Sequence, residues 1–293
     1  MVFSFNSTIR YSEVDSKCVM TLEALTNYFQ DCSVFQSEAL NIGMDHLKHE
    51  NMAWVLASWQ ICIDRLPRLD EKVTISTWAY DMKAFYGYRN FSMTDEKGKT
   101  LAYANSIWVY MDVKNARPVK VPEEMAEIYG LEPKLEMNKA ERKIHVPDDI
   151  EEAGSIVVPR FFIDSNQHMN NEKYILIAKQ LLPEELAVKE IRVEYRKEAK
   201  LGDVIEAKVT DVKEDGKLDL TLREKAYIQM DADSQKILEL LDSYAGVLPF
   251  SEKASPEVIK RETGLSKNAF KRAVGHLYKE RKVDLHDGKI RKL

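Results

Sequence analysis

A carboxylate, an amide and an imidazole occupy alternate positions in the segment Asp164-x-Asn166-x-His168. The segment follows an apolar run at residues 161–163 and precedes a helix start at Asn170. If it is an extended strand, alternate side chains point to one side, so the three would share a face. The unpaired N–H groups at the start of the following helix favour negative charge. A base or nucleophile, an orienting group and an oxyanion site are the parts that acyl transfer requires.

The same residue types are also typical of turns and helix caps, and taken alone the segment favours that structural role. An internal repeat adds a second observation. Residues 14–23 align with residues 163–172 at a constant offset, with Asp, Ser, Met and Glu identical. The first copy has Lys17 and Val19 where the second has Asn166 and His168. Only the second copy could therefore carry this chemistry.

The elements that must position the segment also repeat. Thr21 and Asn170 are the expected N-caps of two helices with apolar residues at helical spacing. Strands are expected after each helix, at residues 53–63, 73–80, 86–94 and 101–113 in the first copy and at 191–196, 204–212 and 218–222 in the second. One long helix followed by antiparallel strands predicts a sheet wrapped around a central helix, in two copies.

Residues 3–209 resemble the acyl-acyl carrier protein thioesterase family, whose fold is a double hot-dog. Two strings carry most of the resemblance, DSNQHMNNEKY at residues 164–174 and VEYRKE at residues 193–198. Shorter matches support it, namely Gln30-Asp31-Cys32, Trp54-Val55-Leu56, Thr77-Trp78, Arg89-Asn90-Phe91, residues 106–112, Arg117-Pro118 and Val121-Pro122. The resemblance implies hydrolysis of the thioester of an acyl chain on acyl carrier protein, without a metal or cofactor.

The resemblance also implies four catalytic residues, Asp164, Asn166, His168 and Glu198. It leaves open whether Asp164 attacks as a nucleophile or Glu198 activates water as a general base. Without the family, Glu198 would be interpreted as a surface carboxylate paired with a neighbouring cation. Plant members place a cysteine directly after this glutamate, whereas this chain has Ala199. A thiol at that place is therefore not required if the chain is active.

A different resemblance covers residues 202–293, which are similar to the end of the conserved virulence factor B family, RNA-binding proteins with S1-like barrels and a terminal winged helix. The residues that carry it are Asp215-Gly216-Lys217-Leu218-Asp219-Leu220, Gly246-Val247-Leu248-Pro249, Ser255-Pro256-Glu257, Ser266-Lys267 and Gly275-x-Leu277-Tyr278-Lys279. Local signals agree with a winged helix. Helices are expected at residues 233–243, from Ser255-Pro256 to Gly264 and from Ser266, and the wing at residues 283–292.

Charge differs between the two parts. Residues 251–293 contain 12 Lys or Arg and 6 Asp or Glu, a net charge of +6, whereas the first 250 residues have a net charge of −11. A basic helix-turn-helix can bind nucleic acid. An equal alternative is a protein–protein or appendage module whose lysines only keep it soluble. The alternative function is therefore an acyl-sensing regulator whose hot-dog does not hydrolyse and whose tail binds nucleic acid.

These observations predict an α+β chain, a double hot-dog followed by a small winged-helix domain. The expected domains are an N-terminal hot-dog at residues 1–130, a linker at 131–155, a truncated C-terminal hot-dog with the site at 156–230, and the winged helix at 231–293. The chain has three cysteines and no visible signal peptide or apolar run of membrane-spanning length, so we expect a cytoplasmic protein without a membrane partner. A homodimer is left open.

Overall fold

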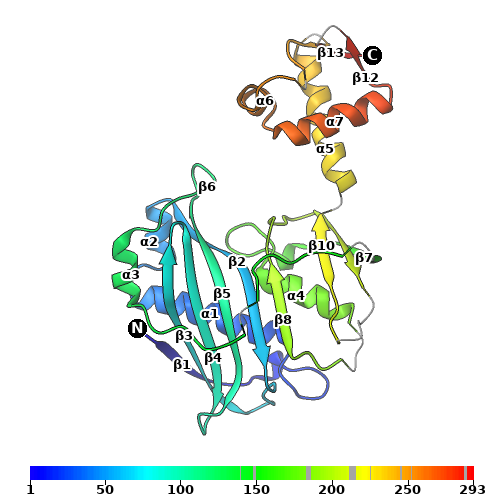
Figure 1. The fold of residues 1–293 in the computed structure, drawn as a ribbon. Coiled ribbons are helices and arrows are strands. Elements are labelled where there is room, and N and C mark those ends of the chain that lie inside the picture. Colours follow the sequence, from blue (N-terminus) through cyan, green and yellow to red (C-terminus); the bar gives the residue numbers. More distant parts are fainter. Residues whose placement is uncertain are drawn as a thin grey trace. The chain divides into compact units, whose positions relative to one another are not determined.

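The computed structural model describes residues 1–138, 140–147, 150–182, 186–210, 216–224, 226–244, 246–251, 253–286 and 289–293 (Figure 1). The chain forms two compact units. One contains Met1–Ile150, Phe161–Glu198 and Thr210–Leu220, and the other contains Glu151–Arg160, Ala199–Val209 and Thr221–Leu293. Within the described part of the chain, no helix is both long and apolar enough to cross a membrane.

The first unit is built on a seven-stranded sheet with the path β1-β3-β4-β5-β2-β8, in which β6 also pairs with β5. Its strands are β1 (Phe3–Thr8), β2 (Met52–Ile63), β3 (Lys72–Lys83), β4 (Tyr86–Asp95), β5 (Thr100–Asp112), β6 (Arg117–Pro118) and β8 (Glu190–Glu194). All the described pairings between these strands are antiparallel. The four strands expected in the first copy are therefore confirmed, with small differences at their ends.

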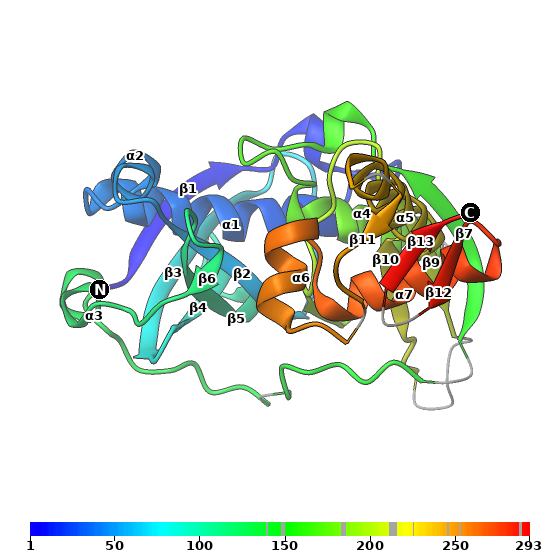
Figure 2. The same ribbon diagram turned by 90° about the horizontal axis from the view of Figure 1, so that it is seen from above.

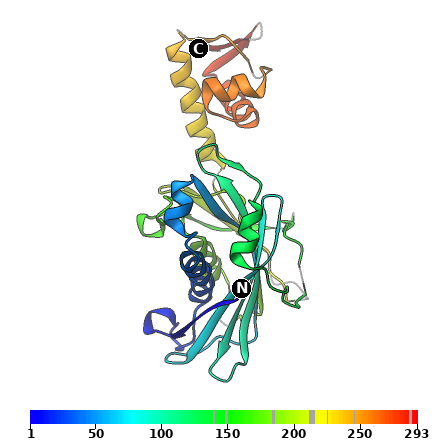
Figure 3. The same cartoon turned by 90° about the vertical axis from the view of Figure 1, so that its left-hand side faces the viewer.

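Helix α1 (Leu22–Ala39) packs against this sheet, and Figure 3 shows it nearly end-on beside the strands. It begins where the sequence predicts, because the Thr21 side chain accepts a hydrogen bond from the N–H of Ala24. Phe29 is fully buried, with its ring 5.3 Å from that of Phe91 and 6.3 Å from that of Trp59. The short helices α2 (Met44–His49) and α3 (Glu123–Tyr129) lie at a second, smaller core.

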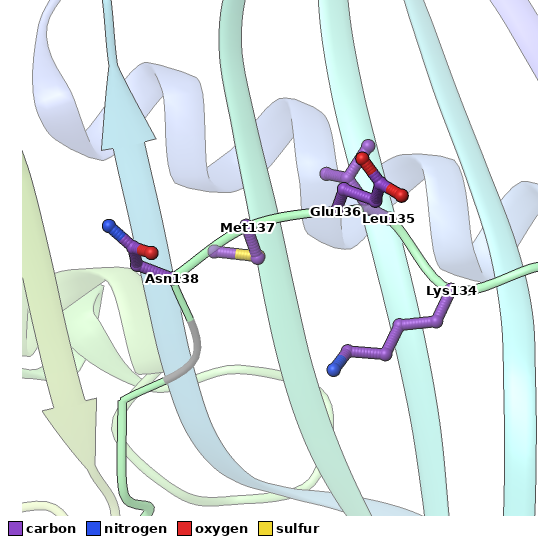
Figure 4. Close-up of a pocket in the computed structure, with 5 residues that line it drawn as sticks. All are labelled: Lys134, Leu135, Glu136, Met137 and Asn138. Atoms are coloured by element: carbon purple, nitrogen blue, oxygen red, sulfur yellow. The ribbon is translucent and has the colours of Figure 1, made fainter.

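Residues 131–138 and 140–147, which we call the strap, run along the face of the sheet opposite α1 (Figure 2). Side chains of β3, β4 and β2 bond the strap backbone: Trp78 to Pro133, Asn90 to Leu135, and Gln60 to Asn138 and Ala140. Figure 4 shows Lys134–Asn138 of the strap, which line a pocket. This charged segment, expected as a linker, is thus fastened to the sheet by its backbone.

The second copy has counterparts for most elements of the first. They are β7 (Glu151–Val157), α4 (Asn171–Gln180), β8, β9 (Val204–Val209) and β10 (Leu220–Glu224). In the first copy β5 pairs with both β4 and β2, but β10 is followed by a helix, and the described residues contain no counterpart of β5. Strands β10, β9 and β7 form a separate three-stranded sheet. Residues 211–215, which include the end of the strand expected at 204–212, lie outside the described residues.

The winged helix has its own core. Its elements are α5 (Ala226–Ser243), β11 (Val247–Leu248), α6 (Pro256–Thr263), α7 (Lys267–Lys279), β12 (Val283–His286) and β13 (Lys289–Lys292). The predicted caps are confirmed: the Ser255 and Ser266 side chains each accept a backbone N–H, and Gly264 ends α6 at φ 72°. Helix α5 starts at Ala226 rather than at residue 233, because residues 226–232 contain no Gly or Pro that would interrupt a helix.

Candidate active site

The segment that carries Asp164, Asn166 and His168 is a tight loop. The extended conformation that would place the three on one face is therefore wrong, and the turn that the same residue types also indicate is confirmed. The N–H of Asp164 donates to the carbonyl of His168 at 2.9 Å, and the N–H of Gln167 donates to the carbonyl of Asp164 at 3.1 Å. Gln167 has a φ of 64°. The apolar run before the loop begins in the 3₁₀ helix η2 (Arg160–Phe162) and is not a strand. Loop closure therefore brings the site residues together without a strand face.

The Asp164 carboxylate holds this loop. Its Oδ1 accepts the N–H of Asn166 at 2.8 Å and that of His168 at 3.4 Å. This is the local pattern by which an Asp side chain stabilises a turn in its own backbone. Its second oxygen, Oδ2, forms no hydrogen bond with the residues that the structure describes. One oxygen of the carboxylate thus stabilises the loop and the other is left for chemistry.

The first copy contains the same loop without the site. The N–H of Asp15 donates to the carbonyl of Val19 at 2.8 Å. The Oδ1 of Asp15 accepts the N–H of Lys17 at 2.9 Å and that of Val19 at 3.0 Å, and Cys18 has a φ of 55°. These positions lie 149 residues before their counterparts in the second loop. The predicted repeat is therefore confirmed in the backbone, and the copies differ in the side chains that the loop presents.

His168 and Glu198 meet in the structure. Nε2 of His168 lies 3.1 Å from Oε2 of Glu198, and the two side chains are 28% and 54% exposed. Arg196 pairs with Glu194, so it is not the cation partner of Glu198, whose carboxylate faces the imidazole of His168. The Asn166 side chain is exposed, and it forms no hydrogen bond with the described residues.

Helix α4 begins at the end of the loop. Asn170 is its N-cap, as predicted, because its Oδ1 accepts the N–H of Glu172 at 3.2 Å. The N–H of Asn170 donates to the carbonyl of Phe162 at 2.9 Å, so it is not free to bind an oxyanion, contrary to the expectation. The N–H of Asn171, the first residue of α4, has no partner in the described part of the chain. It is the donor that the helix start offers beside the loop.

Sequence reasoning missed the strap as part of this region. The N–H of Ile144 donates to Oε2 of Glu194 at 3.0 Å, and Nη2 of Arg196 donates to the carbonyl of Ile144 at 2.9 Å. The missed signal is the pair of charged residues on either side of Tyr195 in the VEYRKE string. The strand that leads to Glu198 is therefore fastened to the strap by its own side chains.

Three family models match the chain. Residues 1–129 match the acyl-ACP thioesterase N-terminal domain, and residues 147–237 match the acyl-ACP thioesterase C-terminal domain. Residues 235–291 match the CvfB-like winged helix domain. The C-terminal match runs further than the resemblance that the motifs show, which ends near residue 209.

Solved structures of thioesterases share this fold. A Lactobacillus plantarum protein assigned as an oleoyl thioesterase is 27% identical, with a TM-score of 0.70 over 77% of this chain and 92% of that one. An acyl-ACP thioesterase from Bacteroides thetaiotaomicron is 22% identical, with a TM-score of 0.69 over 76% of this chain and 93% of that one. The 12:0-ACP thioesterase from Umbellularia californica is 20% identical, with a TM-score of 0.62 over 76% of this chain and 98% of that one.

The C-terminal part has its own relatives. Conserved virulence factor B from Staphylococcus saprophyticus is 41% identical over 97 residues, which are 33% of this chain and 32% of that protein. The protein of the same name from Staphylococcus epidermidis is 40% identical over 97 residues, 33% of each chain. The chain spans about a third of the length of these relatives. The likeness is therefore to one part of each protein.

Proposed function

This chain carries the N-terminal and C-terminal domains of the acyl-ACP thioesterase family followed by a CvfB-like winged helix domain, and from that premise we propose that it hydrolyses acyl-acyl carrier protein thioesters and releases free fatty acid. The observation that carries the proposal is the contact between His168 and Glu198, at 3.1 Å, beside the first turn of α4. The first copy folds into the same loop but has Val19 in place of the imidazole, which limits the chemistry to the second copy.

In the proposed reaction, water attacks the thioester carbonyl while Glu198, in contact with His168, takes its proton. The new C–O bond forms a tetrahedral oxyanion, and the N–H of Asn171 at the start of α4 is the donor nearest in sequence to the loop that could stabilise it. The C–S bond then breaks, and the proton returns from the pair to the departing thiolate. Asp164 shapes the loop, and Asn166 and His168 orient the water and the carbonyl.

Hydrolysis of acyl-carrier-protein thioesters of several chain lengths, beside the same acyl groups on coenzyme A, tests the proposal. We expect release of free fatty acid with a higher kcat/KM for the carrier-bound substrate. The alternative is an acyl-sensing regulator that binds nucleic acid. It is favoured by α7, whose exposed Lys271, Arg272 and Lys279 stand on a helix without an acidic residue. Absence of hydrolysis, together with nucleic-acid binding that weakens steeply with salt, would replace the proposal by that alternative.

The proposed reaction needs no cysteine, because Ala199 stands where the resemblance places a thiol in plant members. Burial raises the pKa of Cys32 to about 12, so this thiol stays protonated and unreactive at neutral pH. Cys18 is exposed and sits in the loop of the first copy. We therefore expect hydrolysis to survive alkylation with iodoacetamide. Inactivation in proportion to the labelling of one cysteine, with an unchanged circular dichroism spectrum, would contradict this expectation.

A further inference from the structure

The contact between His168 and Glu198 is too exposed to fix its own geometry. The side chains of His168 and Glu198 are 28% and 54% exposed. Exposed ion pairs typically contribute only about 0–1 kcal/mol, because water screens the charges and ordering the side chains costs entropy. The approach of Nε2 to Oε2 must therefore be set by the backbone segments that carry the two residues. What holds those segments together is then part of the site.

A half-buried tyrosine joins the two segments. The hydroxyl of Tyr195 donates to the carbonyl of Asn171, the first residue of α4, at 3.0 Å. Tyr195 precedes Glu198 by three residues, and Asn171 follows His168 by three. The N–H of Tyr195 donates to the carbonyl of Ala57 in β2 at 2.9 Å, which continues the pairing of β8 with β2. The hydrogen bond thus ties the start of α4 to the end of β8.

The surroundings of Tyr195 make this bond a fixed one. Its ring packs edge-to-face against Tyr174 of α4, with 5.7 Å between the ring centroids. Burial raises the pKa of Tyr195 well above its ordinary value, and the negative charge of Glu172 raises it further. The hydroxyl therefore stays protonated over the working pH range. It remains a hydrogen-bond donor to a backbone carbonyl rather than an acid or base.

The residues on either side of Tyr195 fasten the same strand end to the strap. Oε2 of Glu194 accepts the N–H of Ile144 at 3.0 Å and Nη2 of Arg196 at 2.7 Å, and Nη2 of Arg196 also donates to the carbonyl of Ile144 at 2.9 Å. The Glu194 side chain is only 12% exposed. Burial opposes its ionisation, but the hydrogen bonds from Arg196 and Ile144 hold the pKa of Glu194 below its usual range. The strand end is therefore held by α4 through Tyr195 and by the strap through its two neighbours.

We propose that Tyr195 is a positioning residue, whose hydrogen bond to the carbonyl of Asn171 sets the distance between His168 and Glu198, with Glu194 and Arg196 bracing the same strand end against the strap. The inference rests on the proposed hydrolysis for its kinetic consequence. The geometry itself does not depend on that activity. It gives a physical role to the Glu-Tyr-Arg part of the VEYRKE string, which the sequence alone leaves unexplained.

Tyr195→Phe removes one hydroxyl and keeps the ring. A displacement of about 1 Å between reacting groups can cost about 10²-fold in rate, so we expect kcat to fall by about 10- to 100-fold with KM little changed. Tyr28→Phe is the matched control, because the Tyr28 hydroxyl donates to Oε2 of Glu13 at 2.9 Å beside the loop of the first copy. It removes the same hydroxyl, which also hydrogen-bonds Oγ of Ser7 at 2.9 Å, and we expect its kcat to equal that of the wild type.

The ring ¹⁵N signals of His168 provide a readout that does not depend on activity. We expect the signals of Tyr195→Phe to move toward those of Glu198→Gln, in which the carboxylate partner of His168 is removed, and those of Tyr28→Phe to remain at the wild-type positions. Wild-type signals and wild-type kcat in Tyr195→Phe would overturn the proposal, as would equal losses of kcat in the two phenylalanine variants. If the wild type hydrolyses no thioester, the proposed function fails, and the NMR comparison still decides the role of Tyr195.

Should Tyr195→Phe fail to fold, Arg196→Gln tests the contact with the strap instead, because Arg196 is exposed and its substitution leaves the Tyr195 ring in place. We expect a smaller fall in kcat and a smaller shift of the His168 signals in the same direction. Unchanged kcat and unchanged signals in this variant would show that the strand end needs no brace.

Discussion

Replacing His168 by alanine is expected to lower kcat for acyl thioesters by about 10²- to 10⁴-fold, the range that a positioned acid or base contributes to a reaction. In the structure, Nε2 of His168 lies 3.1 Å from Oε2 of Glu198, and the substitution removes one half of that pair. The His168 side chain is partly exposed, so its truncation should leave no large cavity and should cost little stability. Stopped assays of fatty-acid release measure kcat, and a thermal melt measures the change in stability.

The first copy supplies the control. Val19 occupies the position of His168 in a loop with the same backbone hydrogen bonds. Val19→Ala therefore truncates the side chain at the matching position of the first loop, and we expect its kcat to remain at the wild-type value. Equal losses from the two substitutions, with both proteins folded, would place the active site elsewhere.

The fold was predictable where local chemistry determines it. The N-caps Thr21, Asn170, Ser255 and Ser266 all accept the backbone N–H that the sequence predicts. The strands of the first copy follow from long apolar runs bounded by turn residues. In each case the deciding interaction lies within a few residues along the chain, so a pattern in the sequence is enough to show it.

The conformation of the site was less predictable. Asp164 was expected in an extended segment, but its Oδ1 bonds the backbone two and four residues ahead. The signal was present, since Asp followed by polar residues before a helix is typical of such turns. The positive φ at Gln167 was hidden, because Gln is not among the residues that favour this region. The shared face assumed a strand with a period of two, although the residues taken alone favoured a turn.

Long-range contacts could not be derived from the residues at all. His168 and Glu198 are 30 residues apart, and only the family resemblance joined them in one site. The strap appeared as a charged linker because it has no periodicity. Its contacts with the sheet use side chains of β2, β3 and β4 to bond the strap backbone, and nothing in residues 131–147 themselves encodes those partners. The same reason hid the bond from Tyr195 to Asn171.

Removal of the Asp164 side chain is the second substitution from which we expect a large effect. Asp164→Ala loses the acceptor for two backbone N–H groups in the loop that presents His168, and unsatisfied groups of this kind cost about 1–3 kcal/mol where water cannot replace the bond. We expect hydrolysis to fall by at least about 10²-fold, because the loop carries the proposed acid–base pair. Asp15→Ala breaks the same two bonds in the first copy. It should lower the melting midpoint by a similar amount and leave kcat nearly unchanged.

Asp164→Asn distinguishes the structural role of Asp164 in the loop from a role as the nucleophile. The amide oxygen can still accept the N–H groups of Asn166 and His168, so the melting midpoint should stay close to the wild-type value. An amide cannot attack a carbonyl as a carboxylate does. If water activated by Glu198 starts the reaction, as proposed, Asp164→Asn should keep hydrolysis that Asp164→Ala loses, whereas Glu198→Gln should not. Complete loss of activity in Asp164→Asn with an intact loop would instead assign the attack to Oδ2 of Asp164, the oxygen that the loop leaves unbonded, and would make Glu198 the base of a second, hydrolytic step.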